Sequence, residues 1–256
     1  MASYNTNEFR AGLKLLLDGE LEWADGLVET YGYTLTHDGV PGTCVDLTNT
    51  AWLELAGDDP SDSATATVCT EAPLELAPTA TADLAREYAW SIAKVADATQ
   101  RTADASGTAT FTYTVTARAG AATDSGWKLQ GSVEIANPNQ YADGDITADV
   151  TAATDLGGGA VCTVTGGADA VIGADSSTTL PIACTFASKP AGSGTVSVTA
   201  TWDPPGEASS TSVTETTEPI SFGVRSETNK TVQVVDDKTV AGQRVVLDPA
   251  LTWAAG

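Results

Sequence analysis

The chain has 256 residues and carries 34 Asp and Glu against 12 Lys and Arg, which gives a formal net charge of −22. So few cations exclude a nucleic-acid groove and an anionic membrane surface as partners, because both need clustered Lys and Arg. No apolar run is long enough to span a membrane. The single His argues against His-based catalysis and against a zinc site.

Residues 1–22 differ from the rest of the chain and are predicted to be a leader of unlike origin. Phe9, Leu13, Leu16 and Leu17 fit a helical stripe, whereas Leu13, Leu15 and Leu17 fit a strand, so both structures remain open. The segment lacks the clean apolar stretch of a secretory signal peptide, so no export signal is expected here.

From residue 29 onward the pattern is typical of short strands with Gly, Pro and Asp between them. The clearest case is 108–117, where Phe111, Tyr113 and Val115 alternate with threonines. Residues 85–96 also fit an amphipathic helix, but their period of two favours a strand. This spacing predicts an all-β protein of immunoglobulin-like antiparallel β-sandwich repeats. Strands are expected over residues 31–36, 44–55, 64–70, 85–96, 108–117, 127–137, 146–152, 161–165, 171–172, 178–186, 195–202, 212–222, 231–235 and 244–247.

An internal repeat suggests how these strands form domains. Residues 42–52 line up with residues 194–202, and a Ser- and Thr-rich strand follows each. Chance similarity between Thr-rich strands is the alternative. If the repeat is real, a partial sandwich is expected, because only its closing half is present. Such a half exposes an apolar face and strand edges, which something must cover.

The expected domains follow from that repeat. The leader over 1–22 is followed by a partial sandwich, the closing half, over 23–80. A complete sandwich covers 81–221. Terminal strands over 222–256 then complete either the first half within the chain or the matching half of a neighbour.

The four cysteines are Cys44, Cys69, Cys162 and Cys184, and none belongs to a CxxC pair. Three disulfide connectivities are possible. The local one joins Cys44 to Cys69 and Cys162 to Cys184, each within one sandwich. Buried free thiols are the alternative, since Cys also behaves as a small apolar residue.

Two acidic loops are the candidate metal sites. Asp58, Asp59 and Asp62 lie in one, and Asp143 and Asp145 in the other. Carboxylate clusters suit weak extracellular Ca²⁺ sites, but solvated turns explain the same residues. No local motif selects a catalytic pair, so no enzyme activity and no other cofactor is expected.

Trp52, Trp90, Trp127 and Trp202 fall within expected strands. Strand aromatics usually lie in the core, and the alternative is a carbohydrate-stacking face formed by two exposed rings on one sheet.

The central block resembles a domain of surface-anchored and secreted proteins of Gram-positive bacteria. The resemblance lies in residues 86–94, 109–116, 124–133, 135–139, 162–164 and 183–185. It implies an immunoglobulin-type sandwich of the kind that is repeated in extracellular stalks and adhesins. The expected role is thus a non-enzymatic structural or adhesive module at the cell surface or in secretions, with copies of itself or neighbouring surface domains as partners. A carbohydrate- or protein-binding module is the alternative.

The first twenty residues resemble a different family. Residues 5–14 and 17–20 are similar to the start of bacterial translation elongation factor P. That family carries a modified lysine in a loop soon afterwards, whereas residues 21–42 contain no Lys or Arg. The departure leaves a translation role as the least favoured expectation.

Overall fold

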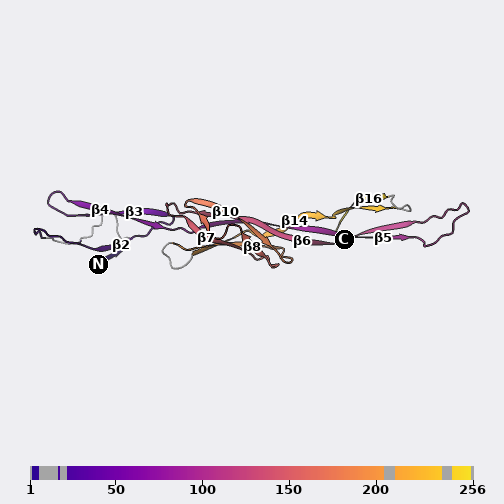
Figure 1. Ribbon diagram of the computed structural model, residues 1–256, viewed down its shortest axis with the longest axis horizontal. Coiled ribbons are helices and arrows are strands. Elements are labelled where there is room, and N and C mark those ends of the chain that lie inside the picture. The colour runs from indigo at the N-terminus through magenta and orange to yellow at the C-terminus, as the bar shows by residue number, and fades with distance from the viewer. Residues whose placement is uncertain (1, 6–16, 18–21, 205–210, 238–243, 255–256) are drawn as a thin grey trace.

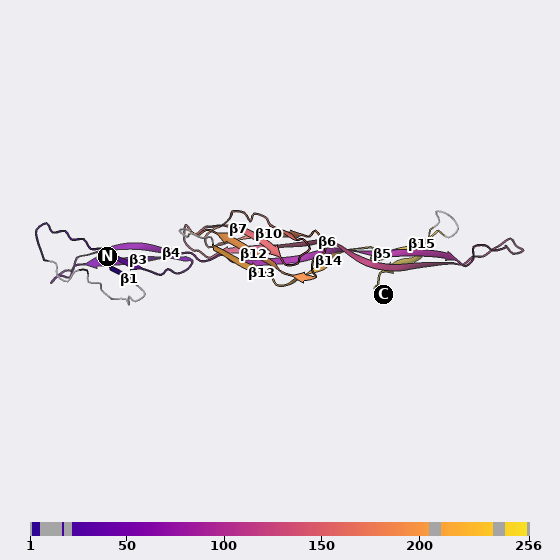
Figure 2. The ribbon, with the colours of Figure 1, turned by 90° about the horizontal axis from the view of Figure 1, so that it is seen from below.

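The structure is a computed structural model that describes residues 2–5, 17, 22–204, 211–237 and 244–254. These residues form an elongated all-β molecule (Figures 1 and 2). Within the described ranges, no helix is long and apolar enough to cross a membrane. The strands are β1 (Ala2–Asn5), β2 (Tyr33–Thr36), β3 (Thr43–Trp52), β4 (Ser61–Thr70), β5 (Glu75–Ala96), β6 (Tyr113–Asn137), β7 (Ile146–Thr154), β8 (Val161–Val164), β9 (Ala170–Ile172), β10 (Ser176–Thr185), β11 (Ser193–Gly194), β12 (Val196–Trp202), β13 (Thr211–Thr216), β14 (Ile220–Thr228), β15 (Thr231–Asp236) and β16 (Val245–Thr252).

A two-layer sandwich forms the centre of the molecule. One sheet has the strand order β11-β14-β5-β6-β10-β8, and the other has the order β13-β12-β7-β9. Val133, Ile172, Val196 and Val198 are fully buried between them. Along β12 every second residue is buried, as expected for a strand with one face in the core. The core therefore rests on period-two patterning.

The hairpin of β5 and β6 is longer than the sandwich. β5 has 22 residues and β6 has 25, and their outer halves extend past the two sheets (Figure 2). We call residues 85–96 and 113–125 the distal hairpin. β14 pairs in parallel with β5 from Ala82 to Glu87, and β15 and β16 form their own antiparallel pair beside the distal hairpin (Figure 1).

The opposite end of the molecule holds the strands before the sandwich. β3 and β4 form an antiparallel hairpin, and β1 pairs in parallel with β2 (Figure 1). We call residues 22–72 the N-terminal arm. Almost all of its side chains are exposed or half-buried, and none belongs to the buried core cluster. The arm is thus held by pairing and by its junction with the sandwich.

The strand predictions are largely confirmed, with two instructive errors. Residues 85–96 are strand, not helix. The expected separate strands 108–117 and 127–137 fall on one strand, β6, which begins only at Tyr113 and continues because Asp124-Ser125-Gly126 forms a bulge rather than a turn. Gly126 has φ +62, and the pairing with β5 shifts register there. The expected strand 212–222 is two strands in different sheets, β13 and β14, separated by residues 217–219.

The sandwich extends beyond the expected bounds of 81 and 221. Leu74 is fully buried in the core, β5 begins at Glu75, and β14 continues to Thr228. The described residues of the tail lie beside the distal hairpin, away from β3 and β4 (Figure 1). The arm and the described residues of the tail therefore lie toward opposite ends, and β15 and β16 pair with each other rather than with β3 or β4.

Candidate functional site

Two asparagines at the end of β6 join the arm to the sandwich. Asn139 is fully buried; its Oδ1 accepts a hydrogen bond from the Ala72 N–H at 2.8 Å, and its Nδ2 donates to the Ala72 carbonyl at 3.1 Å. Asn137 donates from Nδ2 to the carbonyls of Gly144 and Ile172, at 2.8 and 2.9 Å. Its Oδ1 accepts from the Asn139 side chain at 2.7 Å. A buried network in which each amide has partners rigidifies what it connects.

Backbone contacts reinforce this joint. The Gly42 N–H donates to the Thr70 carbonyl at 2.7 Å, and the Gln140 N–H donates to the Gly42 carbonyl at 2.8 Å. Gly42 has φ +78, and a Cβ there would lie 2.9 Å from the Pro138 carbonyl oxygen. Only glycine fits both the conformation and the approach. The base of the β3–β4 hairpin is thereby fixed to the loop after β6.

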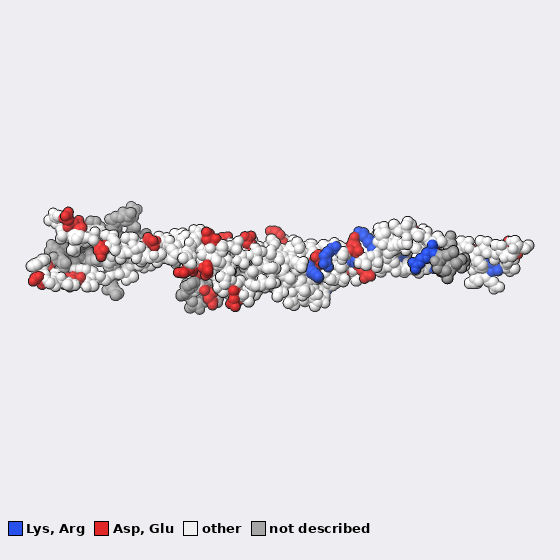
Figure 3. Space-filling model, turned by 45° about the horizontal axis from the view of Figure 1, so that its top comes forward, with Lys and Arg blue, Asp and Glu red and all other residues white. Residues whose placement is uncertain are grey.

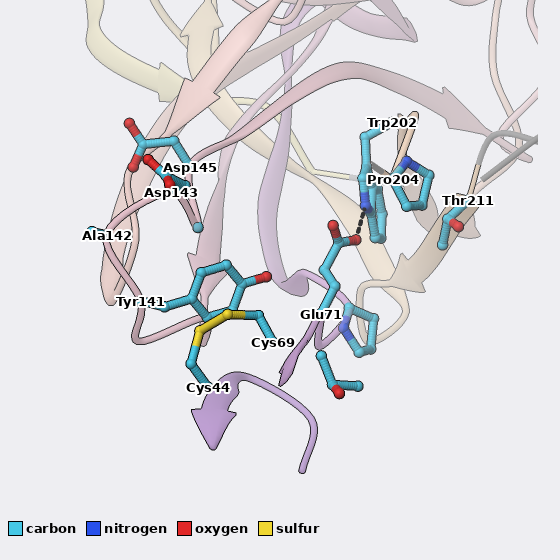
Figure 4. Close-up of a pocket in the computed structure, with 13 residues that line it drawn as sticks. Cys44, Cys69, Glu71, Tyr141, Ala142, Asp143, Asp145, Trp202, Pro204 and Thr211 are labelled. Carbon is cyan, nitrogen blue, oxygen red and sulfur yellow. Dashed lines mark hydrogen bonds between the residues drawn. A yellow bond between two sulfur atoms is a disulfide. The ribbon is translucent and has the colours of Figure 1, made fainter. Parts of the chain in front are cut away.

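A groove of about 760 Å³ opens between the joint and the sandwich (Figure 4). Trp202 at the end of β12 donates from Nε1 to a Glu71 carboxylate oxygen at 2.6 Å. Tyr141 lies on the other wall, where burial and then the negative charge of Glu71 raise the pKa of its phenol. The lining holds acidic residues and no Lys or Arg. The hydrogen bond between Trp202 and Glu71 joins the sandwich to the end of the arm.

Both disulfides are present in the local pairing, which confirms that prediction. Cys44 in β3 is bonded to Cys69 in β4, directly opposite in register. Cys162 in β8 is bonded to Cys184 in β10, again as register partners. Cys184 is buried in the core, whereas the Cys44–Cys69 disulfide lies at the wall of the groove (Figure 4). One disulfide therefore braces the sandwich and the other braces the arm.

The calcium hypothesis for the acidic loops stays a prediction. Among the described residues no group of three or more His, Cys, Asp or Glu side chains is placed to hold a metal ion, and these include Asp58, Asp59, Asp62, Asp143 and Asp145. The carboxylates instead order their own backbone. Asp59 accepts from the Leu55 N–H and Asp62 from the Ser63 N–H, and the Asp145 carboxylate accepts from the Ala174 N–H.

An aromatic cluster attaches the tail to the distal hairpin. The rings of Tyr88 and Trp253 lie 4.7 Å apart between centroids. Trp253 Nε1 donates to the Gly120 carbonyl at 2.9 Å, and Trp90 Nε1 donates to the Asn229 carbonyl at 2.8 Å. The tail is held there by aromatic contact and directed hydrogen bonds.

The Tyr88 hydroxyl donates to Glu227 at 2.5 Å. This hydrogen bond, followed by burial, raises the pKa of Tyr88. Lys230, bonded to Glu227 at 2.8 Å, is the main cause that lowers the pKa of the Glu227 carboxyl. Tyr88, Glu227 and Lys230 thus form one chain of charge-assisted contacts.

Ion pairs add to this end of the molecule. Arg86 and Asp124 form a two-bond pair across β5 and β6 with a shortest distance of 2.6 Å. That hydrogen bond lowers the pKa of Asp124. Lys94 bonds Asp236 at 2.8 Å, which raises the pKa of the Lys94 amine. Such partly exposed pairs fix orientation more than they stabilise.

Of the four tryptophans in expected strands, Trp202 lies in the core, as predicted for an aromatic residue on a strand. Sequence reasoning missed the residues that hold the joint and the tail, namely Glu71, Asn137, Asn139, Tyr88 and Trp253. A signal was present for the asparagines: Asn-Pro-Asn at the end of a strand places two side-chain amides on either side of a residue that has no backbone N–H.

Neither a scan against protein-family models nor a search of the curated proteins finds a match. The segment that resembles elongation factor P lies outside the described residues, apart from positions 2–5 and 17.

Proposed function

We propose that this chain is a non-enzymatic extracellular structural module, a stalk or spacer that bears tension along its long axis. The observation that carries the proposal is the parallel pairing of the sandwich's first strand, β5, with its last strand, β14. The chain enters β5 from the arm and leaves β14 toward the tail, and these parts lie toward opposite ends (Figure 2).

Parallel first and last strands resist stretching. A pull on the arm draws β5 one way along its axis, and a pull on the tail draws β14 the other way. The backbone hydrogen bonds between Ala82–Glu87 and Phe222–Thr228 are then loaded in shear and must fail together. The contact of the Phe186 and Phe222 rings, 5.5 Å apart, holds β14 to the rest of the sandwich.

The joint and the disulfides suit the same role. The buried Asn137–Asn139 network keeps the arm in line with the sandwich, and two disulfides fit an oxidising, extracellular compartment. The acidic surface keeps such a module soluble.

Single-molecule pulling tests the proposal. Handles at the two chain ends are expected to give one high-force event for the sandwich. The residues enclosed by a disulfide cannot extend under force, and the two disulfides have sequence separations of 25 and 22 residues. Reduction is therefore expected to lengthen the unfolded chain by about 80 Å per disulfide.

A matched control uses the same chain pulled from one end. Handles at Ser106, in the loop beyond the distal hairpin, and at the C-terminus peel β14 from β5 one hydrogen bond at a time, at a much lower force. Equal forces in the two geometries, or extension without any event, would refute the mechanical role.

A further inference from the structure

The two ends of the chain carry the same short motif in different surroundings. Leu-x-Trp-Ala-x-Gly occurs at residues 21–26 and again at residues 251–256. Trp253 in the second copy is docked on the distal hairpin against Tyr88, with its backbone N–H donating to the Lys230 carbonyl at 2.7 Å. Trp23 in the first copy is 86% exposed.

The flanking surfaces are apolar at both ends. The arm exposes Leu27, Val28, Val40, Leu53 and Leu55, and the distal end exposes Ile92, Val95, Tyr113, Val246 and Leu247. None of these residues belongs to the core cluster. Exposed apolar groups gathered at two ends of a long molecule mark contact surfaces.

The two ends differ in charge, because the arm is strongly acidic whereas residues 85–128 and 223–254 hold eight Asp and Glu beside nine Lys and Arg. The arm has ten Asp and Glu and no Lys or Arg. Nine of the twelve Lys and Arg lie in residues 85–128 and 223–254, and Figure 3 shows the blue side chains gathered in that half. Among the described residues, Arg118 and Arg244 form no ion pair. An acidic arm therefore suits this end.

We propose that the N-terminal arm of one copy docks on the distal hairpin of a second copy, with Trp23 taking the position that the second copy's own Trp253 occupies in the isolated chain. The partner is a second copy of this chain, and the contact is head to tail. A heterologous contact of this kind extends into a filament. The inference rests on the proposed stalk function and specifies how such modules join.

Competition for one site makes the proposal testable by sedimentation of the full chain over a range of concentrations. The wild type is expected to associate weakly and reversibly, because Trp253 blocks its own site in most molecules. Trp253→Ala frees the site and is expected to tighten association at least about tenfold. Trp23→Ala removes the docking ring and is expected to weaken it at least about 30-fold.

Three controls keep the outcomes separate. Trp23 is so exposed that its substitution leaves the fold intact, which circular dichroism checks. Val171→Ala, an exposed change on β9 away from both ends, is expected to match the wild type. The double variant W23A/W253A is expected to stay monomeric, and 0.5 M salt is expected to weaken association of W253A.

Association of W23A equal to the wild type would overturn the proposal, as would association retained in the double variant or monomers in both the wild type and W253A. The pulling experiment follows single chains and does not depend on association. A failed docking test therefore leaves the mechanical proposal standing, and a missing unfolding event would not affect the docking result.

Discussion

Asn139→Ala is the sharpest perturbation of the joint. The Asn139 side chain satisfies both backbone groups of Ala72, at 2.8 and 3.1 Å, in a fully buried position. Alanine leaves the Ala72 N–H and C=O without partners. A buried unsatisfied group costs about 1–3 kcal/mol, and two such groups with some relaxation predict a loss of about 2–4 kcal/mol in the free energy of unfolding.

Urea unfolding of the full chain measures that loss, and hydrogen exchange locates it. The Ala72 amide is expected to be protected in the wild type and to exchange much faster in N139A, because its acceptor has gone. Asn49→Ala is the matched control. Asn49 is exposed on β3 and donates one hydrogen bond, to the Tyr33 hydroxyl, so its loss is expected to stay below about 1 kcal/mol.

The reasoning would be refuted if N139A and N49A unfolded at the same urea concentration with the same slope. It would also be refuted if N139A lost stability while the Ala72 amide stayed protected, since the loss would then come from somewhere other than the joint.

Three further outcomes are expected. Replacing Cys162 and Cys184 together by Ser removes the disulfide that reaches the core and lowers the free energy of unfolding of the sandwich by about 3 kcal/mol. The same change at Cys44 and Cys69 leaves the unfolding transition of the sandwich where it was. Thermal unfolding of the two double variants measures the difference. Gly131→Ala puts a Cβ 1.9 Å from the Thr79 carbonyl oxygen, so β5 and β6 must shift, and the urea midpoint falls by an amount equivalent to about 1–3 kcal/mol. Asp104 accepts three hydrogen bonds inside its loop, and these, the one from the Ser106 hydroxyl first, lower the pKa of its carboxyl below the ordinary 3.8. The loop is therefore fully ordered above pH 3.8 and loses its order as the pH falls through the lower pKa of the folded state. An NMR titration that gives Asp104 an unshifted pKa would contradict this expectation.

The pattern of the sequence predicted those parts of the fold whose structure is decided by residues close together in the chain. β12 could be predicted because larger apolar and small polar residues alternate with little interruption from Val196 to Trp202. The disulfides were readable because each joins strands close in sequence, with separations of 25 and 22 residues. Local pairing of this kind needs no knowledge of the whole fold.

The errors have a common physical cause. Asp124-Ser125-Gly126 has the composition of a turn, yet Arg86 on the facing strand pairs with Asp124 and keeps the chain extended through a bulge. Similarly, residues 212–222 have strand composition throughout, and only the two-sheet architecture separates β13 from β14. Contacts between distant segments decided both cases.

The candidate site was the least predictable part because its contacts span the greatest sequence distances. The Asn139 amide and its Ala72 partner are 67 residues apart, and Trp202 is 131 residues from Glu71. The parallel register of β5 and β14 joins Ala82 to Phe222, and neither strand carries a local mark of it. A repeated motif such as that of Trp23 and Trp253 is the one long-range signal a single sequence offers.

The two proposals meet in the direction of load. A head-to-tail contact that places the arm of one copy on the distal hairpin of another applies tension at residues 22–72 and at the distal hairpin, toward opposite ends of each molecule (Figure 1). That tension enters β5 at its start and at its far end, and the pairing of β5 with β6 along the hairpin shares it between the two strands. The contact buries the exposed apolar residues at each end of one copy against the next copy. An array of such copies would therefore yield at the docked tryptophan before the sandwich unfolds, since a peripheral contact holds less surface than two packed sheets.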